Sequence, residues 1–300
     1  MFGNIQLLIA APALNVQLLL DGILIGAIFA LAAYGLALVW GVMNVKNLAQ
    51  GDYVILGGYI AWWGQKTFGI HPIVMLPIAC VLLFIMGWLL YLLIIRWVIN
   101  RDMFTSLLAT FGIAFMLAQL LNVAFGPEIQ TAQSGMTTRT LFATVSVAEI
   151  KVVSFVLCCV LAALIVAFMK KSRMGQAIRA TAQDARAARI MGIDTERVYA
   201  FTYALNAAIC AAAGVLISMI WVIQPFYGIT HAIRSFVIVT AAGLGNLPGV
   251  IVAAFGLGVA EQYGGFVLGA ELQQVSVVGL LLIVLIWRQI KLARLRQVVQ

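Results

Sequence analysis

The sequence predicts an all-α polytopic membrane protein with roughly eight to ten transmembrane segments, some of them broken or re-entrant. Hydrophobic residues make up 64% of the 300 residues, and the mean hydropathy is +1.09. Only 9% of the residues are charged, whereas about a quarter of an ordinary soluble domain is charged. Long apolar stretches fill almost the whole chain, which leaves no room for a soluble catalytic domain. We therefore expect a single transmembrane domain over residues 1–300.

Nine apolar segments follow one another along the chain. They cover residues 14–40, 47–65, 72–95, 105–125, 150–168, 198–222, 236–244, 250–267 and 272–287. A transmembrane helix needs about 20 residues, so most of these segments are long enough to span a membrane. Segment 236–244 is too short, because each helical residue adds only ~1.5 Å. We therefore expect 236–244 and 250–267 to form a broken pair or a re-entrant hairpin.

The net charge of +8 is concentrated in two places. Residues 170–197 hold seven basic and three acidic residues, and residues 288–300 hold four basic residues and no acid. In the rest of the chain, seven bases and seven acids cancel. Lys and Arg are biased toward cytoplasmic loops. The pattern predicts a cytoplasmic loop at 170–197 and a cytoplasmic tail at 288–300, with 126–149, 223–234 and the N-terminus outside. It also disfavours a nucleic-acid partner.

Two stretches rich in Gly and Asn interrupt the apolar pattern, one from Gly41 to Asp52 and one from Gly243 to Gly249. Irregular backbone survives at membrane depth only where protein or a water-filled cavity satisfies it. In transporters such interruptions, one in each half, often mark the solute path. The alternative interpretation is close helix packing through glycine. A pseudo-symmetric arrangement of two halves is consistent with both interpretations.

The candidate residues of the translocation path come from these interruptions and from a nearby acid. They are Asn47, Gln50, Asp52, Gly243, Gly245, Asn246 and Glu261. A charged Asp inside the membrane costs ~2.5–3.5 kcal/mol on insertion scales, so Asp52 and Glu261 are functional candidates. The alternatives are a helix N-cap for Asp52 and a buried polar partner for Glu261. The neutral amides suit zwitterions or amides that pass without tight binding.

The loop at 170–197 has a helical pattern of its own. Residues 176–191 contain no Gly or Pro and are rich in Ala and Arg. Gly192 suits the C′ position after this helix, and Asp194 suits the N-cap of the next span, with Glu196 in its first turn. The helix is too polar to be buried in the membrane. It is either a solvated connector or a helix that docks into a cytoplasmic partner.

The sequence shows no pattern of a catalytic or metal centre. It has no C-x-x-C pair, no H-E-x-x-H, and no histidine with a partner at metal-ligand spacing. No Lys follows a Gly, so the phosphate-binding motif G-x-x-x-x-G-K-[ST] is absent. We therefore expect no cofactor, no metal and no enzymatic activity. Any ATP hydrolysis must take place on another chain.

Four stretches resemble the branched-chain amino-acid ABC transporter permease family, the H-type membrane subunit of a high-affinity importer. Residues 47–52 (N-L-A-Q-G-D) and 56–59 (L-G-G-Y) resemble the family's N-F-A-H-G-E…G-A-Y. Residues 108–113 (L-A-T-F-G-I) resemble L-x-T-I-G-L. Residues 172–194 resemble the family's cytoplasmic loop, and 242–261 its G-G-x-G-x-x-x-G…G-E region.

The resemblance implies a permease subunit of a binding-protein-dependent importer in the bacterial inner membrane. It would form half of the path for branched-chain or related small amino acids. Its partners would be a second related permease, two cytoplasmic ATP-binding subunits, and a periplasmic or extracellular binding protein. The loop 186–192 resembles E-A-A-x-x-x-G, with Arg in place of Glu. The implied ATPase-coupling residues are Arg179, Asp184, Arg186, Ala187, Ala188, Arg189 and Gly192.

Two departures from the family pattern leave the solute open. Gln50 stands where the family has His, and residues 97–101 lack the proline of the family's Y-R-P-L-R. A permease of the same family for urea, short amides or another small polar solute is therefore an alternative. A second alternative is a secondary transporter or channel that acts alone. Its flux would then depend on Asp52 or Glu261.

Overall fold

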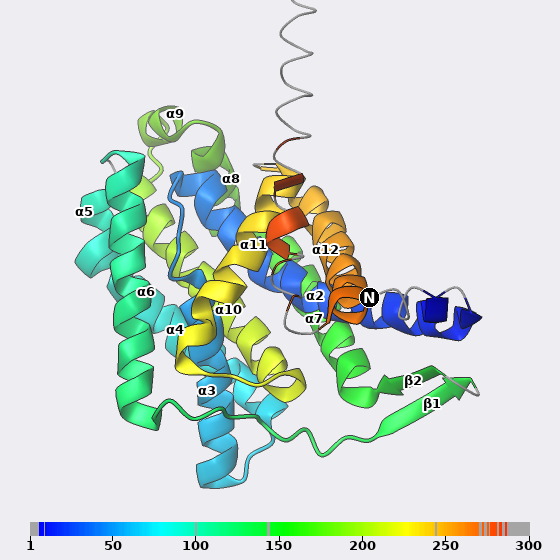
Figure 1. Cartoon of the computed structure of the whole chain (residues 1–300). Helices are drawn as coiled ribbons and strands as arrows, with labels where there is room; N and C mark the ends of the chain where they lie inside the picture. The colour runs from blue at the N-terminus through cyan, green and yellow to red at the C-terminus, as the bar shows by residue number, and fades with distance from the viewer. Residues whose placement is uncertain are drawn as a thin grey trace, which may run out of the picture.

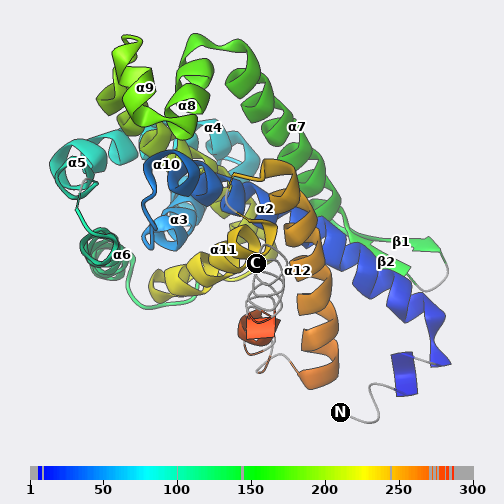
Figure 2. The ribbon, with the colours of Figure 1, turned by 90° about the horizontal axis from the view of Figure 1, so that it is seen from above.

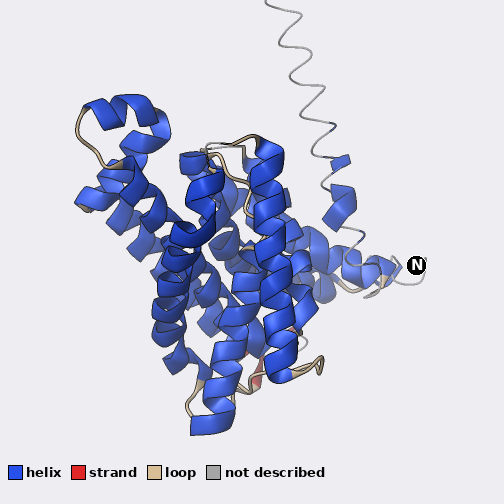
Figure 3. Ribbon diagram, turned by 90° about the vertical axis from the view of Figure 1, so that its left-hand side faces the viewer, coloured by secondary structure: helices blue, strands red, loops and turns tan. Residues whose placement is uncertain are grey.

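The computed structural model describes residues 6–8, 10–99, 101–142, 145–243, 245–269, 272, 275, 277–280, 282, 283 and 286. Within these residues the chain is a bundle of helices with one small β-hairpin (Figures 1 and 3). The predicted all-α membrane fold is confirmed. The predicted basic tail 288–300 and Asn100 lie outside the described residues, as does much of segment 272–287.

The first half of the chain contains α2 (Pro12–Met43), α3 (Gln50–Phe68), α4 (Pro72–Leu90) and α6 (Met103–Phe125). A π-helical turn, η1 (Tyr91–Ile95), and α5 (Arg96–Val98) continue α4. The second half contains α7 (Glu149–Lys171), α8 (Arg173–Gln183), α9 (Ala185–Ile190), α10 (Thr195–Ile220), the 3₁₀ turn η2 (Pro225–Tyr227), α11 (Gly228–Ala242) and α12 (Leu247–Leu268). Between the halves, β1 (Thr138–Phe142) and β2 (Val145–Ala148) pair antiparallel.

Six helical stretches in the described residues are long and apolar enough to cross a membrane: α2, α4 with its continuation, α6, α7, α10 and α12. The shorter α3 and α11 also run through the bundle (Figure 1). The most apolar stretches of α2 and α10 are each 89% buried, whereas that of α7 is 17% buried. Helices α2 and α10 therefore form the centre, and the other helices surround them (Figure 2). The exposed apolar faces of the outer helices suit lipid or another membrane subunit.

The connecting segments gather at two opposite ends of the bundle (Figure 1). At one end lie α8, α9 and the C-terminal end of α2. At the other end, the Gln65 side chain bonds the backbone of Gln133, and the backbones of Gln130 and Ile223 form a β-bridge. The segments 170–197 and 126–149 are thus separated by the length of the bundle, as the charge pattern predicts.

Two helices begin inside the bundle rather than at its ends (Figure 1). The irregular residues 44–49 precede α3, and residues 221–227, which include η2, precede α11. The prediction that 236–244 is a nine-residue segment is wrong, since α11 begins at Gly228 and has 15 residues. The sequence analysis missed the start of α11 because residues 228–235 include polar side chains, which lower the hydropathy. Neighbouring helices rather than lipid bury these side chains. Even so, a helix of 15 residues that rises ~1.5 Å per residue is shorter than the hydrocarbon core of a membrane.

Candidate functional site

The segment 44–49 leads the chain from the end of α2 into the bundle. Asn44 adopts the left-handed conformation with φ 53°, and the chain then turns toward α3. The Asn47 side chain accepts a hydrogen bond from the Ala49 N–H at 3.2 Å. The N-cap of α3 is Ala49, so the interpretation of Asp52 as an N-cap is wrong. Asp52 instead lies in the first turn of α3, where the positive helix end favours an acid.

A polar cluster lies at the centre of the bundle, between α2, α3 and α10. The Tyr53 and Tyr203 hydroxyl oxygens are 2.7 Å apart, and both residues are fully buried. The Tyr203 hydroxyl also donates to the Asn47 Oδ1 at 3.5 Å. The Gln50 Nε2 donates to the backbone carbonyl of Ala32 at 2.6 Å. The sequence analysis did not single out the two tyrosines, because a Tyr in an apolar span gives no signal of its own.

This cluster retains unused hydrogen-bonding capacity. Within the described residues, three of its buried atoms have no hydrogen-bond partner: Asn47 Nδ2, Gln50 Oε1 and Asn206 Nδ2. Buried polar groups normally have hydrogen-bond partners, because a buried group without a hydrogen bond costs about 1–3 kcal/mol. The predicted residues Asn47 and Gln50 therefore lie, with two tyrosines and Asn206, among buried polar groups whose hydrogen-bonding capacity is only partly used.

Asp52 lies at the meeting point of the two interrupted halves. The residue is 4% exposed, and its carboxyl group lies beside Gly228, the first residue of α11. The carboxylate is thus close to the positive N-terminal ends of both α3 and α11. In each half a long helix, α2 or α10, is followed by an interruption and a shorter helix. The two units run in opposite directions (Figure 1), which is the inverted arrangement of two halves seen in many transporters.

Glu261 is buried and paired with an arginine that sequence reasoning missed. The Arg234 Nη2 lies 2.5 Å from the Glu261 Oε1, and the Arg234 Nε lies 3.1 and 3.2 Å from the two carboxylate oxygens. The guanidinium carbon is 5.3 Å from the ring centroids of both Phe29 and Trp221. Residues 223–234 were expected to be an outer loop. Most of them instead belong to η2 and α11, and no local signal reveals this, because the partner of Arg234 is distant in the sequence.

The predicted residues Gly243, Gly245 and Asn246 do not join the central cluster. They form the turn between α11 and α12, and Asn246 caps α12 by accepting from the Gly249 N–H at 3.1 Å. Gly245 and Asn246 are exposed. The second interruption inside the bundle is therefore 221–227, while 243–249 lies at an end. There a cleft of about 320 Å³ separates this turn from α8, with Ile178 among its lining residues.

The loop 170–197 forms two helices rather than the single predicted helix. Ser172 caps α8 by accepting from the Gly175 N–H at 2.8 Å. At Asp184 the helix ends, and the Asp184 Oδ1 accepts from the N–H groups of Arg186 at 2.8 Å and Ala187 at 3.0 Å. The division arises because an Asp side chain competes for backbone N–H groups, which makes Asp a strong N-cap. Arg179 of α8 donates to the backbone carbonyl of Met169, which fixes α8 against the end of α7.

The predicted end of the helix at 176–191 and the predicted start of the next span are both confirmed. Gly192 has φ +85°, and the Ile193 N–H donates to the Ala188 carbonyl at 3.0 Å, as in a Schellman motif. Asp194 caps α10 by accepting from the Arg197 N–H at 3.1 Å. Of the predicted coupling residues, Ala188 is buried, and the others are exposed: Arg179, Asp184, Arg186, Ala187, Arg189 and Gly192.

Two apolar side chains at the tip of this element escaped the sequence analysis. Ile190 is 80% exposed and Met191 is 82% exposed, at the end of α9. Large apolar side chains at a polar tip favour contact with another protein. In the part of the chain that the structure describes, no group of three or more His, Cys, Asp or Glu residues is placed to hold a metal ion. The site thus combines a polar interior, a buried ion pair and an exposed tip with apolar side chains.

Comparison with known proteins gives one consistent result. Residues 18–286 match the family described as branched-chain amino acid transport system / permease component. The chain is 27% identical to the high-affinity branched-chain amino acid transport system permease protein LivH of Salmonella typhimurium, over 90% of this chain and 92% of that protein. It is 26% identical to BraD of Pseudomonas aeruginosa, over 91% and 93% of the two chains. It is 30% identical to a probable LivH of Methanocaldococcus jannaschii, over 83% and 81%.

Proposed function

The chain belongs to the permease family of branched-chain amino acid transport systems, and we propose that it forms half of the path of an ABC importer for these amino acids. Members of this family are transport components rather than enzymes. The observation that carries the proposal is the match over 18–286, which includes both interrupted halves and the α8–α9 element. The high-affinity transport systems named for the relatives supply the substrate class.

The energy for transport comes from two ATP-binding subunits, one of which docks on α8–α9. The chain itself has no phosphate-binding motif, so another chain must hydrolyse ATP. In the docked complex, Ile190 and Met191 insert into the ATP-binding subunit, and Arg186 and Arg189 contact its acidic groups. The cap at Asp184 and the Schellman turn at Gly192 hold the tip rigid. A rigid tip transmits movement from the ATP-binding subunit to α7 and α10, which flank it.

The remaining partners follow from the two ends of the bundle. The α8–α9 end faces the cytoplasm, because it carries the larger share of basic residues within the described chain. The 126–149 end and the N-terminus then face outward, where a binding protein delivers the substrate. A second, related permease covers an exposed apolar side of this bundle and completes the path. Asn47, Gln50 and Asp52 act midway along that path, where α3 and α11 meet.

Cross-linking from the tip of α9 tests the docking proposal. A photoreactive amino acid in place of Met191 should cross-link to the ATP-binding subunit in the assembled complex. The matched control carries the same group in place of Thr140, an exposed residue of β1 at the opposite end. We expect a cross-link to the ATP-binding subunit from position 191 and none from position 140. The reverse pattern would contradict the proposed orientation and docking surface.

A further inference from the structure

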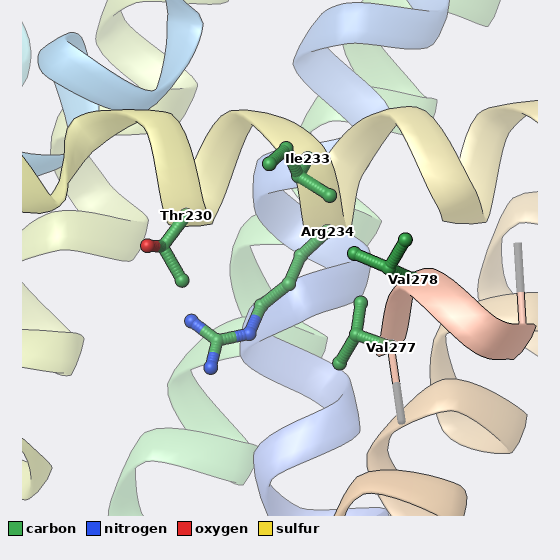
Figure 4. Close-up of a pocket in the computed structure, with 5 residues that line it drawn as sticks. All are labelled: Thr230, Ile233, Arg234, Val277 and Val278. Carbon is green, nitrogen blue, oxygen red and sulfur yellow. The ribbon is translucent and has the colours of Figure 1, made fainter. Parts of the chain in front are cut away.

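Arg234 lines a small pocket on the side of α11. The other described lining residues are Thr230, Ile233, Val277 and Val278, so the guanidinium group is the only charge among the lining residues that the structure describes (Figure 4). Figure 4 shows the Arg234 side chain extending from α11 toward the side of Thr230 and away from Val277 and Val278. The pocket has a volume of about 50 Å³. Since about 10–15 Å³ of such space is enough for one water, the pocket can admit a carboxylate-sized group.

The ion pair with Glu261 uses only part of the arginine. Its hydrogen bonds engage Nε and Nη2. Among the described residues, no partner is found for Nη1, although a guanidinium group has five N–H donors. The rings of Phe29 and Trp221 fix the orientation of the group, each with its centroid 5.3 Å from the guanidinium carbon. The arginine is therefore held in place and still has donors to offer.

Stability alone does not account for this pair. Charges inside the membrane are costly, and a buried ion pair can often be replaced by apolar residues without loss of stability. Glu261 is 1% exposed and cannot itself contact a passing solute, while the Arg234 side chain is 12% exposed. An unpaired arginine would trap an anion. An arginine already neutralised by Glu261 binds a carboxylate weakly, as a transport path requires.

An apolar strip lies beside the pocket. Phe226, Ile229 and Ile233 are 41%, 56% and 36% exposed, and their spacing of three and four residues places them on one side of α11 and the turn before it. Ile233 belongs to both the strip and the pocket lining. A carboxylate site next to an aliphatic surface matches the two ends of a branched-chain amino acid.

We propose that Arg234 and the strip of Phe226, Ile229 and Ile233 form a transit site for the amino acid. The Arg234 N–H groups receive the α-carboxylate, and the strip contacts the aliphatic side chain. This inference rests on the proposed function and extends it by naming the residues that the substrate contacts. It also places the transit site on α11, at the interruption of the second half.

Photo-labelling of the reconstituted importer tests this site. The probe is photo-leucine, a diazirine analogue of leucine, irradiated during ATP turnover with and without excess leucine. Three forms of the complex are compared with the wild type: Arg234→Met with Glu261→Met, the swap Arg234→Glu with Glu261→Arg, and the control Asp21→Asn with Lys151→Gln. The control removes another pair between helices, in which the Lys151 Nζ and the Asp21 Oδ1 are 2.7 Å apart. The swap keeps both charges, in case the methionine pair does not assemble.

In the wild-type complex, we expect a leucine-competed label within residues 226–242. Labelling there and leucine uptake should both fall about tenfold in the methionine pair and in the swap, and both should persist in the control. Uptake at the wild-type rate by the methionine pair or the swap would overturn the inference, as would a label found only outside 226–242. If the wild-type complex takes up no leucine at all, the proposed function itself fails, and the inference fails with it.

Discussion

Gly51, in the first turn of α3, is in backbone contact with Gly228, the first residue of α11. A β-carbon on Gly51 would overlap the carbonyl oxygen of Gly228, and one on Gly228 would overlap the carboxyl group of Asp52. The two interrupted halves therefore meet through glycine, at a separation that no other residue allows. Close glycine packing and interrupted helices are thus not competing interpretations here, because the first permits the second.

Replacing Gly51 with alanine should destabilise the protein. The added methyl group has only backbone to push against, and overpacking of this kind costs about 1–3 kcal/mol. Gly112→Ala in α6 is the matched control, since a β-carbon there meets nothing within 4 Å. Thermal unfolding of the detergent-solubilised variants, followed by fluorescence, compares the two. Equal melting temperatures for Gly51→Ala and the wild type would contradict the contact.

The cap on α9 should weaken in acid. Backbone N–H groups of Ala187 and Arg186 hold the pKa of Asp184 below its usual range. Because the pKa is lower in the folded state, the cap stabilises α9 above the ordinary pKa of Asp and is lost as the pH falls through the folded-state pKa. Hydrogen-exchange protection of residues 186–192, corrected for intrinsic exchange, should decrease over that range. Asp184→Asn, which caps without titrating, should show no such decrease, and identical profiles would contradict the assignment.

Altering the docking element should separate ATP hydrolysis from transport. Gly192→Pro removes the N–H that donates to the Arg189 carbonyl at 3.1 Å and forbids the observed φ of +85°. Charge reversal at Arg186, which is exposed, changes the docking surface without disturbing the bundle. Both variants should lower the leucine transported per ATP hydrolysed by about tenfold or more. An unchanged ratio in both variants would show that α8–α9 is only a connector.

Removing one partner of the Arg234–Glu261 pair should cost more than removing both. Glu261→Gln leaves a buried guanidinium group without its counter-charge, a change worth about 3–5 kcal/mol. Replacing both residues with methionine should restore most of the lost stability. Melting temperatures of Glu261→Met, Arg234→Met and the double methionine variant form a cycle that measures the coupling. Additive effects of the two single changes would mean that the pair does not form.

The sequence predicted the features that depend on local chemistry. A span of about 20 apolar residues identifies a transmembrane helix directly, so the prediction located α4, α6, α7 and α10 within a few residues. Helix ends depend on short-range geometry, and the roles of Gly192 and Asp194 were therefore predictable from their positions. The division at Asp184 had a signal too, since Asp is a strong N-cap, but an Ala- and Arg-rich stretch concealed it.

The features that depend on tertiary contact could not be predicted. The start of α11 has Arg234 and His231, and hydropathy assigns such residues to a loop unless their partners are known. Glu261 supplies the partner for Arg234, but 27 residues separate the two in the chain. The cluster of Tyr53, Tyr203 and Asn47 likewise combines distant segments.

ATP-driven uptake of radiolabelled leucine into proteoliposomes tests the central claim most directly. The liposomes contain this chain with its companion permease and two ATP-binding subunits, and the binding protein is added outside. The account predicts that leucine accumulates only when all of these components and ATP are present, and that this chain alone passes none. Leucine flux through the isolated chain without any ATP-binding subunit would contradict the account.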